Sequence, residues 1–185
     1  MCRYSMTSYK PHYACFTCQK TFKRRLLGDV LGGYSKDVQE KSATCPECRG
    51  VMADMGLDFK SPKKKDTKAW DHIATLYSVD ITFHSCGCSG PGYIPNDKDQ
   101  LKDYFTGIKN TYLEHLYFWA RRKEDPETQS QVAKDQRQHW GFLGRIPKEL
   151  RKGTKNKPKY DAEQALLYWS KKVAEIEKKI NTLTK

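Results

Sequence analysis

The sequence is short of the apolar side chains that usually fill a protein core. Hydrophobic residues make up 37% of its 185 residues and charged residues 30%, so we expect a thin core and an additional source of stability, such as a structural metal ion. A chain of this length suits one ordinary domain, or a small domain with a helical extension.

Long hydrophobic runs are also absent. No stretch approaches the length of a transmembrane helix, and residues 1–20 contain no apolar run of the secretory type. We therefore expect a cytoplasmic protein without a membrane partner. In that reducing compartment, the seven cysteines are better explained by metal ligation than by disulfides.

The sequence lacks the short motifs that mark common enzyme sites. It contains no Walker loop, no dinucleotide-binding glycine pattern, no His-Glu-x-x-His pair and no nucleophile elbow. Zinc deaminases use Pro-Cys-x-x-Cys, but here the proline follows Cys45, and no histidine begins a His-x-Glu motif. We therefore expect that the protein is not an enzyme and has no small-molecule substrate. Metal or thiol chemistry at His84, Cys86 and Cys88 is the remaining enzyme alternative.

Four of the cysteines form two Cys-x-x-Cys turns. Cys15 and Cys18 are separated from Cys45 and Cys48 by 26 residues. A tetrahedral zinc site with metal–sulfur distances of ~2.3 Å needs its sulfur atoms ~3.8 Å apart, and two intervening residues allow a tight turn to place them so. The spacing predicts one structural Zn²⁺ held by these four cysteines, with no open position for substrate or water.

These paired cysteines resemble the zinc-ribbon class over roughly residues 13–50. The resemblance implies two knuckles joined by short strands, and a role in binding nucleic acid or protein. Pro46 fixes the backbone of the second knuckle, and we expect Gly50 to let the chain leave it without a Cβ clash. The wider stretch through Met52–Lys60 looks like uncharacterised bacterial proteins, which implies no activity.

A second metal site is an open alternative at Cys2, His84, Cys86 and Cys88. On an extended strand the last three would share a face ~6.6 Å apart, too far for one ion, so Gly87 would have to break the strand. The other interpretation is that these are reduced cysteines in a glycine-rich turn. Cys86 and Cys88 are also candidates to replace a knuckle cysteine.

Apolar spacing differs between the two halves of the chain. Alternation of apolar and polar residues predicts a β-strand over 75–84. Helical spacing then predicts helices over 101–123 and 161–183, the first ending in basic residues that suit the helix dipole. The predicted fold class is α+β, with a small zinc-ribbon β domain over 1–95 and a basic helical region over 96–185.

The second predicted helix carries apolar residues at heptad spacing, with steps of three and four. They are Leu166, Trp169, Val173, Ile176, Ile180 and Leu183. Two heptads are too few for a free-standing coiled coil. The helix therefore either packs on the helix over 101–123 or docks on a protein partner.

Positive charge is in excess, with a formal net charge of +12. Such a surplus favours a polyanionic partner, because each cation set against a phosphate releases counterions. Two other interpretations are open for some of these cations: they neutralise a zinc–thiolate centre, or they lie in solvent-exposed loops. The basic window over 145–160 is expected to be a loop. The nucleic-acid candidates are Lys23, Arg24, Arg25, Lys63, Lys64, Lys65, Arg145, Lys148, Arg151, Lys152, Lys155 and Lys157.

These features lead to two functional hypotheses. The first is a non-enzymatic zinc-binding module that binds nucleic acid, with RNA preferred because aromatic rings, 11 Tyr, 7 Phe and 4 Trp, stack on unpaired bases. Trp70, which follows the lysines at 63–65, is one such ring. A ribosome-associated role fits by analogy. The alternative is an adaptor that docks a partner through the heptad-spaced helix.

Overall fold

The computed structural model describes residues 10–25, 42–85, 90–122, 124–154 and 156–184. The chain divides into two compact units, the N-terminal unit Met1–Gln100 and the C-terminal unit Leu101–Lys185. Small antiparallel sheets and four helices make up the regular structure of the described residues, so the fold class is α+β. None of the described helices has the length and apolar character needed to cross a lipid bilayer.

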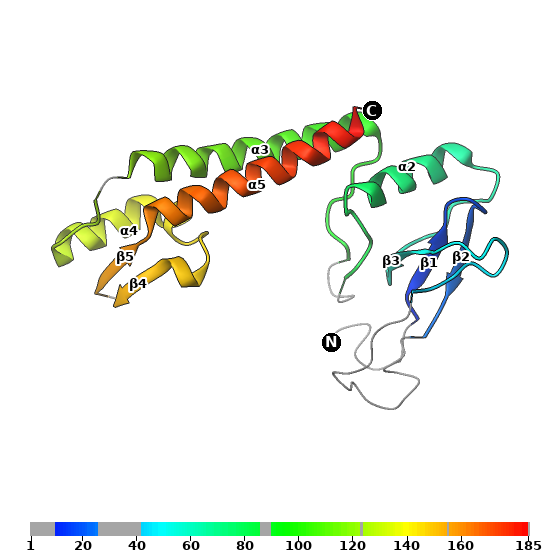
Figure 1. Cartoon of the computed structure of the whole chain (residues 1–185), viewed down its shortest axis with the longest axis horizontal. Coiled ribbons are helices and arrows are strands. Elements are labelled where there is room, and N and C mark those ends of the chain that lie inside the picture. The colour runs from blue at the N-terminus through cyan, green and yellow to red at the C-terminus, as the bar shows by residue number, and fades with distance from the viewer. Residues whose placement is uncertain (1–9, 26–41, 86–89, 123, 155, 185) are drawn as a thin grey trace. The chain divides into compact units, whose positions relative to one another are not determined.

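The N-terminal unit is built on a three-stranded antiparallel sheet (Figure 1). The strands are β1 His12–Cys15, β2 Lys20–Lys23 and β3 Ala53–Gly56, in the order β2-β1-β3. Cys15 pairs with Lys20, so the first Cys-x-x-Cys turn forms the end of the β1–β2 hairpin. Ala14 and Met55 are fully buried on the covered face of this sheet.

Helix α2, Thr67–Ser78, packs on the sheet through Trp70 and Ile73, which join Ala14, Ala53 and Met55 in one core cluster. Asp66 caps its first turn by accepting a hydrogen bond from the Ala69 N–H at 3.1 Å. The helix contradicts the strand predicted over 75–84, because residues 75–78 form its last turn.

The prediction of a strand over 75–84 failed because this window spans the end of a helix and the start of an extended segment. Together their apolar residues alternate with polar ones as they would in a single strand. Trp70 and Ile73, upstream of that window, and Leu76 within it repeat at helical spacing. Asp80 then takes a left-handed conformation, φ 63°, which ends the run. Beyond it the Phe83 N–H donates to the Met55 carbonyl at 2.9 Å, so only this short segment lies against β3.

The C-terminal unit contains three helices and a two-stranded hairpin. They are α3 Lys98–Arg121, which begins at the end of the N-terminal unit, α4 Gln129–Leu143, the 3₁₀ turn Lys148–Leu150, β4 Arg151–Thr154, β5 Lys157–Tyr160 and α5 Ala162–Leu183. Helices α3 and α5 lie close to the ranges expected from the sequence. They run side by side (Figure 1), with Lys109 of α3 ion-paired to Glu177 of α5 at 2.7 Å.

Two elements of this unit differ from expectation. Helix α4 was not predicted, because it buries only Val132 and Leu143; its start is fixed by a capping box between Thr128 and Gln131. The basic window over 145–160 is not a loop as predicted. Its second half is the β4–β5 hairpin, in which Gly153 of β4 lies opposite Pro158 and takes a left-handed conformation, φ 83°, that favours glycine.

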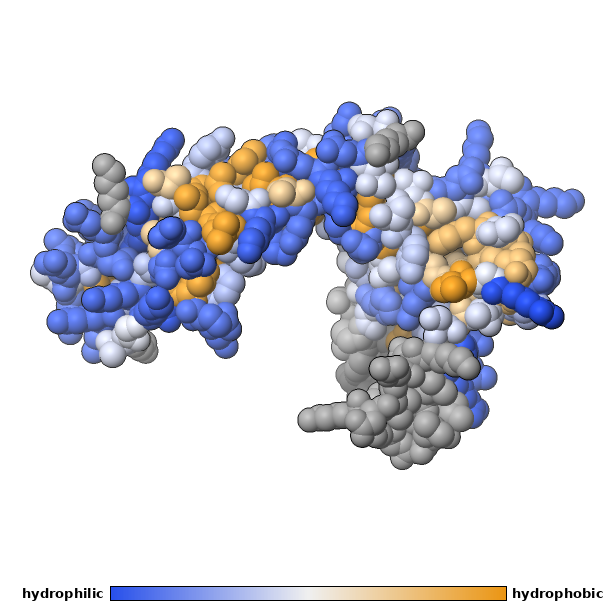
Figure 2. Space-filling view, viewed as in Figure 1, coloured by the Kyte–Doolittle hydropathy of each residue, from blue (hydrophilic) through white to orange (hydrophobic). Residues whose placement is uncertain are grey.

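The core of the C-terminal unit is aromatic. Trp119 of α3 and Trp169 of α5 are 2% and 4% exposed, and they pack with Leu143, Ile146 and Ala165. On the face drawn in Figure 2, hydrophobic side chains of this unit form a band along α3 and α5 between hydrophilic ones.

The heptad face of α5 turns inward. Trp169, Ile176 and Leu183 are buried, and the Trp169 ring lies 5.3 Å from that of Tyr112 on α3. The structure therefore agrees with packing on α3, and it leaves these three side chains unavailable to a partner helix.

Candidate functional site

Four cysteine side chains converge at one end of the N-terminal sheet. The sulfur atoms of Cys15 and Cys48 lie 3.6 Å apart and those of Cys18 and Cys45 lie 3.9 Å apart. All four ligand atoms fall within 4.8 Å of one another. These separations match the ~3.8 Å expected between thiolates of a tetrahedral metal site. The structure thus places the four predicted ligands where they can hold one metal ion.

Each Cys-x-x-Cys turn has a backbone suited to present two sulfur atoms. In the first, the Cys18 N–H donates to the Cys15 sulfur at 3.4 Å, and Gln19 takes φ 52°. In the second, the Arg49 N–H donates to the Cys45 carbonyl at 2.8 Å, and Arg49 takes φ 61°. The left-handed residue is therefore Arg49 and not Gly50, where a Cβ would meet only an ordinary contact with Cys48.

The crowded sulfur atoms perturb one another strongly. The pKa of Cys45 is lowered to about 7, chiefly by the backbone N–H of Cys48. The pKa of Cys18 is raised to about 12, chiefly through its contact with the Cys48 thiol, and burial raises the pKa of Cys15. Four such groups cannot all ionise side by side without a cation between them, so the donor set fits a bound metal ion.

An ion pair between Lys20 and Glu47 links the two knuckles. The hydrogen bond from Lys20 lowers the pKa of Glu47, and the charge of Lys64 adds to this effect. Lys20 is therefore engaged by Glu47 beside the four cysteines, and Lys64 lies close enough to Glu47 to act on it.

The lysines at 63–65 form a fixed turn with exposed side chains. The Trp70 indole N–H donates to the Lys63 carbonyl at 3.2 Å, and the Thr21 hydroxyl donates to that of Ser61 at 2.9 Å, tying this segment to β2. Trp70 is 2% exposed, so it anchors the turn and does not offer a stacking surface. We name the exposed cations Lys23, Arg24, Arg25, Lys63, Lys64 and Lys65 the N-terminal basic surface.

The second basic region lies on the β4–β5 hairpin. Lys152 and Lys159 are directly opposite, and Thr154 is opposite Lys157. Arg151 has a structural role, because its guanidinium donates to the carbonyls of Gly144 and Ile146, both at 2.6 Å, at the end of α4. Arg145, Lys148 and Lys157 are exposed, and Lys155 lies outside the described residues.

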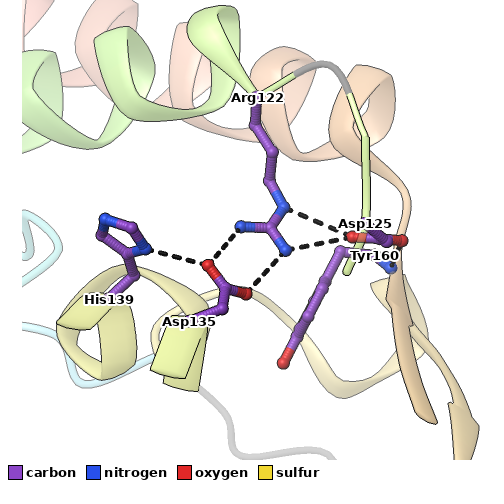
Figure 3. Close-up of polar contacts among 5 residues, drawn as sticks. All are labelled: Arg122, Asp125, Asp135, His139 and Tyr160. Carbon is purple, nitrogen blue, oxygen red and sulfur yellow. Dashed lines mark hydrogen bonds and ion pairs between the residues drawn. The ribbon is translucent and has the colours of Figure 1, made fainter. Parts of the chain in front are cut away.

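Sequence reasoning assigned Arg122 only a helix-dipole role, but it is the polar centre of the C-terminal unit. Figure 3 shows its guanidinium between Asp125 and Asp135, with hydrogen bonds of 2.9–3.1 Å from the terminal nitrogens. The Arg122 side chain is 8% exposed and lies over the rings of Phe118 and Tyr160, 5.8 and 5.1 Å from their centroids.

Asp135 also holds a histidine. Its carboxylate lies 2.9 Å from Nδ1 of His139 (Figure 3). Burial tends to raise the pKa of Asp135, but the hydrogen bonds from Arg122 and His139 outweigh it and hold the pKa below its ordinary value. Asp135 is therefore an ionised carboxylate that orients both neighbours.

Next to Arg122, helices α3 and α4 border an open cleft of about 610 Å³. We name it the α3–α4 cleft; its lining residues are Glu114, Tyr117, Phe118, Arg121, Arg122, His139 and Phe142. The rings of Phe118 and Phe142 are nearly parallel, 4.5 Å apart at 11°. Sequence reasoning missed this cleft because α4 itself was not predicted.

Of the four residues in the alternative second metal site, Cys2, Cys86 and Cys88 lie outside the described residues. Only His84 can be placed. Nε2 of His84 lies 3.7 Å from a carboxylate oxygen of Asp54, and the side chain is exposed.

Comparisons of the chain with known protein families, with curated proteins and with solved structures gave no match. Its fold and sites are therefore interpreted from their own geometry.

Proposed function

We propose that the four cysteines bind one Zn²⁺ as a structural ion in a zinc-ribbon-like unit. Four thiolates fill a tetrahedral shell, which favours zinc and leaves no position for catalysis. The sulfur separations of 3.6 and 3.9 Å carry this proposal. The ion would join the β1–β2 hairpin to the second knuckle.

We further propose that the protein binds nucleic acid, and single-stranded RNA in preference to duplex DNA. The observation that carries this proposal is the fixed turn at Lys63–Lys65, which holds three exposed ammonium groups beside the metal centre. A turn that is already ordered loses little conformational entropy when it meets a phosphate backbone. Exposed aromatic rings, such as Trp140 at 73% and Tyr117 at 55%, favour unpaired bases.

The hairpin supplies a second set of cations for the same kind of partner. Lys152, Lys157 and Lys159 share one face of β4–β5 by register. Lys152 is ion-paired with Asp161 at 3.0 Å, so Lys157 and Lys159 are the better candidates on this face. Arg151 is left out of the proposed interface because its guanidinium is committed to main-chain carbonyls.

Binding to a fluorescent single-stranded RNA, measured by anisotropy at several salt concentrations, tests this proposal. Replacement of Lys63, Lys64 and Lys65 by Glu should weaken binding and reduce the salt slope by roughly 2, the counterion release of three phosphate contacts on a single strand. The matched control replaces Lys102, Lys171 and Lys178, exposed lysines of α3 and α5, by Glu with the same change in charge.

Equal loss in both triple variants would indicate a net-charge effect and contradict the assigned surface. Wild-type protein that binds no RNA at low salt would contradict the proposed function itself. A ribosome is one RNA-rich partner consistent with it, and co-sedimentation of the protein with ribosomes on sucrose gradients would test that role.

A further inference from the structure

We propose that the α3–α4 cleft binds one unpaired base of a single-stranded RNA. This inference rests on the proposed function, and it adds a site for bases to surfaces that were assigned only to phosphates. The cleft volume, about 610 Å³, lies in the range typical of sites for small ligands.

The walls of the cleft have the chemistry that a base requires. Tyr117 of α3 is 55% exposed and offers the ring on which a base can stack. Phe118 and Phe142, which stack on each other, line the cleft beside it. Aromatic rings stack on the π-face of any base, and such stacking is largely independent of sequence. An isolated tyrosine on a helix surface would say little, but here it borders a hollow lined by two further aromatic rings.

Charged groups at the cleft match the polar parts of a nucleotide. Arg121 is exposed beside Tyr117, and within the described residues it makes no ion pair, so its guanidinium is available to a phosphate. Glu114 is exposed on the same wall, where its carboxylate can accept N–H groups from the edge of a base. Adenine, cytosine and guanine carry exocyclic amino groups that suit this acceptor, and uracil does not.

The cleft is held in shape before any ligand arrives. Arg122 lies over Phe118 and is fixed by Asp125 and Asp135, while Asp135 also orients His139. The same network ties the end of α3 to α4, the two helices that form the walls. A cleft that is already formed binds a base at lower entropic cost than one that must first be assembled.

The test uses the full-length protein and a ten-nucleotide cytidine RNA with one central 2-aminopurine, whose fluorescence falls when it stacks on an aromatic ring. Tyr117→Ala should weaken binding at least about 5-fold, the lower limit for loss of one stacked base. It should also abolish the fluorescence quenching and leave the salt slope unchanged. Tyr117→Phe should retain the quenching, because the ring remains.

Tyr104→Ala is the matched control, since Tyr104 is a 37% exposed tyrosine of the same helix outside the cleft. Circular dichroism of each variant confirms that the helices are intact. RNA binding with the same affinity and quenching in wild type and Tyr117→Ala would overturn the cleft assignment and leave the proposed function standing. Absence of RNA binding by wild-type protein would overturn both.

Discussion

The two units of this chain hold themselves together by different means. In the N-terminal unit each strand has only four residues, and the apolar core gathers around Met55 and Trp70 between the sheet and α2. The C-terminal unit instead packs long helices around Trp119 and Trp169, and its sequence contains no cysteine. On our proposal, a metal ion cross-links the short strands and turns of the first unit, whereas the second unit relies on the packing of long helices.

Metal removal should produce the largest difference in stability between the two units. Structural zinc contributes about 10–16 kcal/mol to the folding of small zinc-bound domains, so a strong chelator should unfold the N-terminal unit. The α3–α5 helices should persist. Hydrogen–deuterium exchange measured by mass spectrometry should show lost protection in residues 10–85 and retained protection in α5, and chelator already loaded with zinc serves as the control. Simultaneous loss in both units would contradict this division.

A core truncation should act on the other unit alone. Trp169→Ala removes a 4% exposed ring that packs against Tyr112 and His115, and such losses cost about 3–5 kcal/mol. Urea unfolding followed by far-ultraviolet circular dichroism should show this loss for the helices. Trp140→Ala is the control, since that ring is 73% exposed and its removal should change stability by less than about 0.5 kcal/mol. A metal affinity that also fell in Trp169→Ala would break the comparison.

Disruption of the Arg122 network should have an intermediate effect. Asp135→Asn removes a charge-assisted partner of a buried guanidinium, for a loss of about 1.5–3 kcal/mol in the unfolding free energy of the C-terminal unit. Urea titration at neutral pH measures it. Asp103→Asn on the exposed surface of α3 is the matched control, and an equal effect of both substitutions would show that the network contributes no stability.

The same network predicts a pH dependence. Because the folded-state pKa of Asp135 lies below its ordinary value of 3.8, its stabilising effect is fully present above that value and is lost as pH falls through the folded pKa. The difference in stability between wild type and Asp135→Asn should therefore be constant from neutral pH to about pH 5 and shrink below about pH 4. A difference that grows on acidification would contradict the assigned sign.

The smallest expected effect concerns the hairpin. Lys159 lies directly opposite Lys152, and like charges in that position are unfavourable by a few tenths of a kcal/mol. Lys159→Glu should therefore slightly raise the thermal midpoint of the C-terminal unit and weaken RNA binding at the same time. Lys159→Gln separates the loss of repulsion from the gain of attraction, and unchanged RNA affinity in both variants would remove the hairpin from the interface.

Local sequence patterns predicted the parts of the structure that depend on local geometry. The Cys-x-x-Cys spacing identified the four cysteines that converge, and helical periodicity identified α3 and α5. Alternation over 75–84 misled because the end of α2, a left-handed Asp80 and a short extended segment together imitate a strand.

Features that depend on distant partners could not be predicted. Arg122 resembles any basic residue at a helix end until Asp125 and Asp135 are folded around it. Arg151 resembles a phosphate ligand until α4 supplies the carbonyls that it binds. The α3–α4 cleft depends on α4, which was not predicted because it has too few apolar residues to show helical periodicity. Arg122, Arg151 and Trp70 show that counts of basic and aromatic residues do not reveal which of these side chains are engaged within the fold.

The central claim is that one zinc ion bound by four thiolates organises the N-terminal unit. Native mass spectrometry of the full chain, purified without added metal, measures this directly. We predict one zinc per chain in wild-type protein and none in the Cys45→Ser, Cys48→Ser double variant. Wild-type protein without zinc, or the double variant with its zinc retained, would contradict the account.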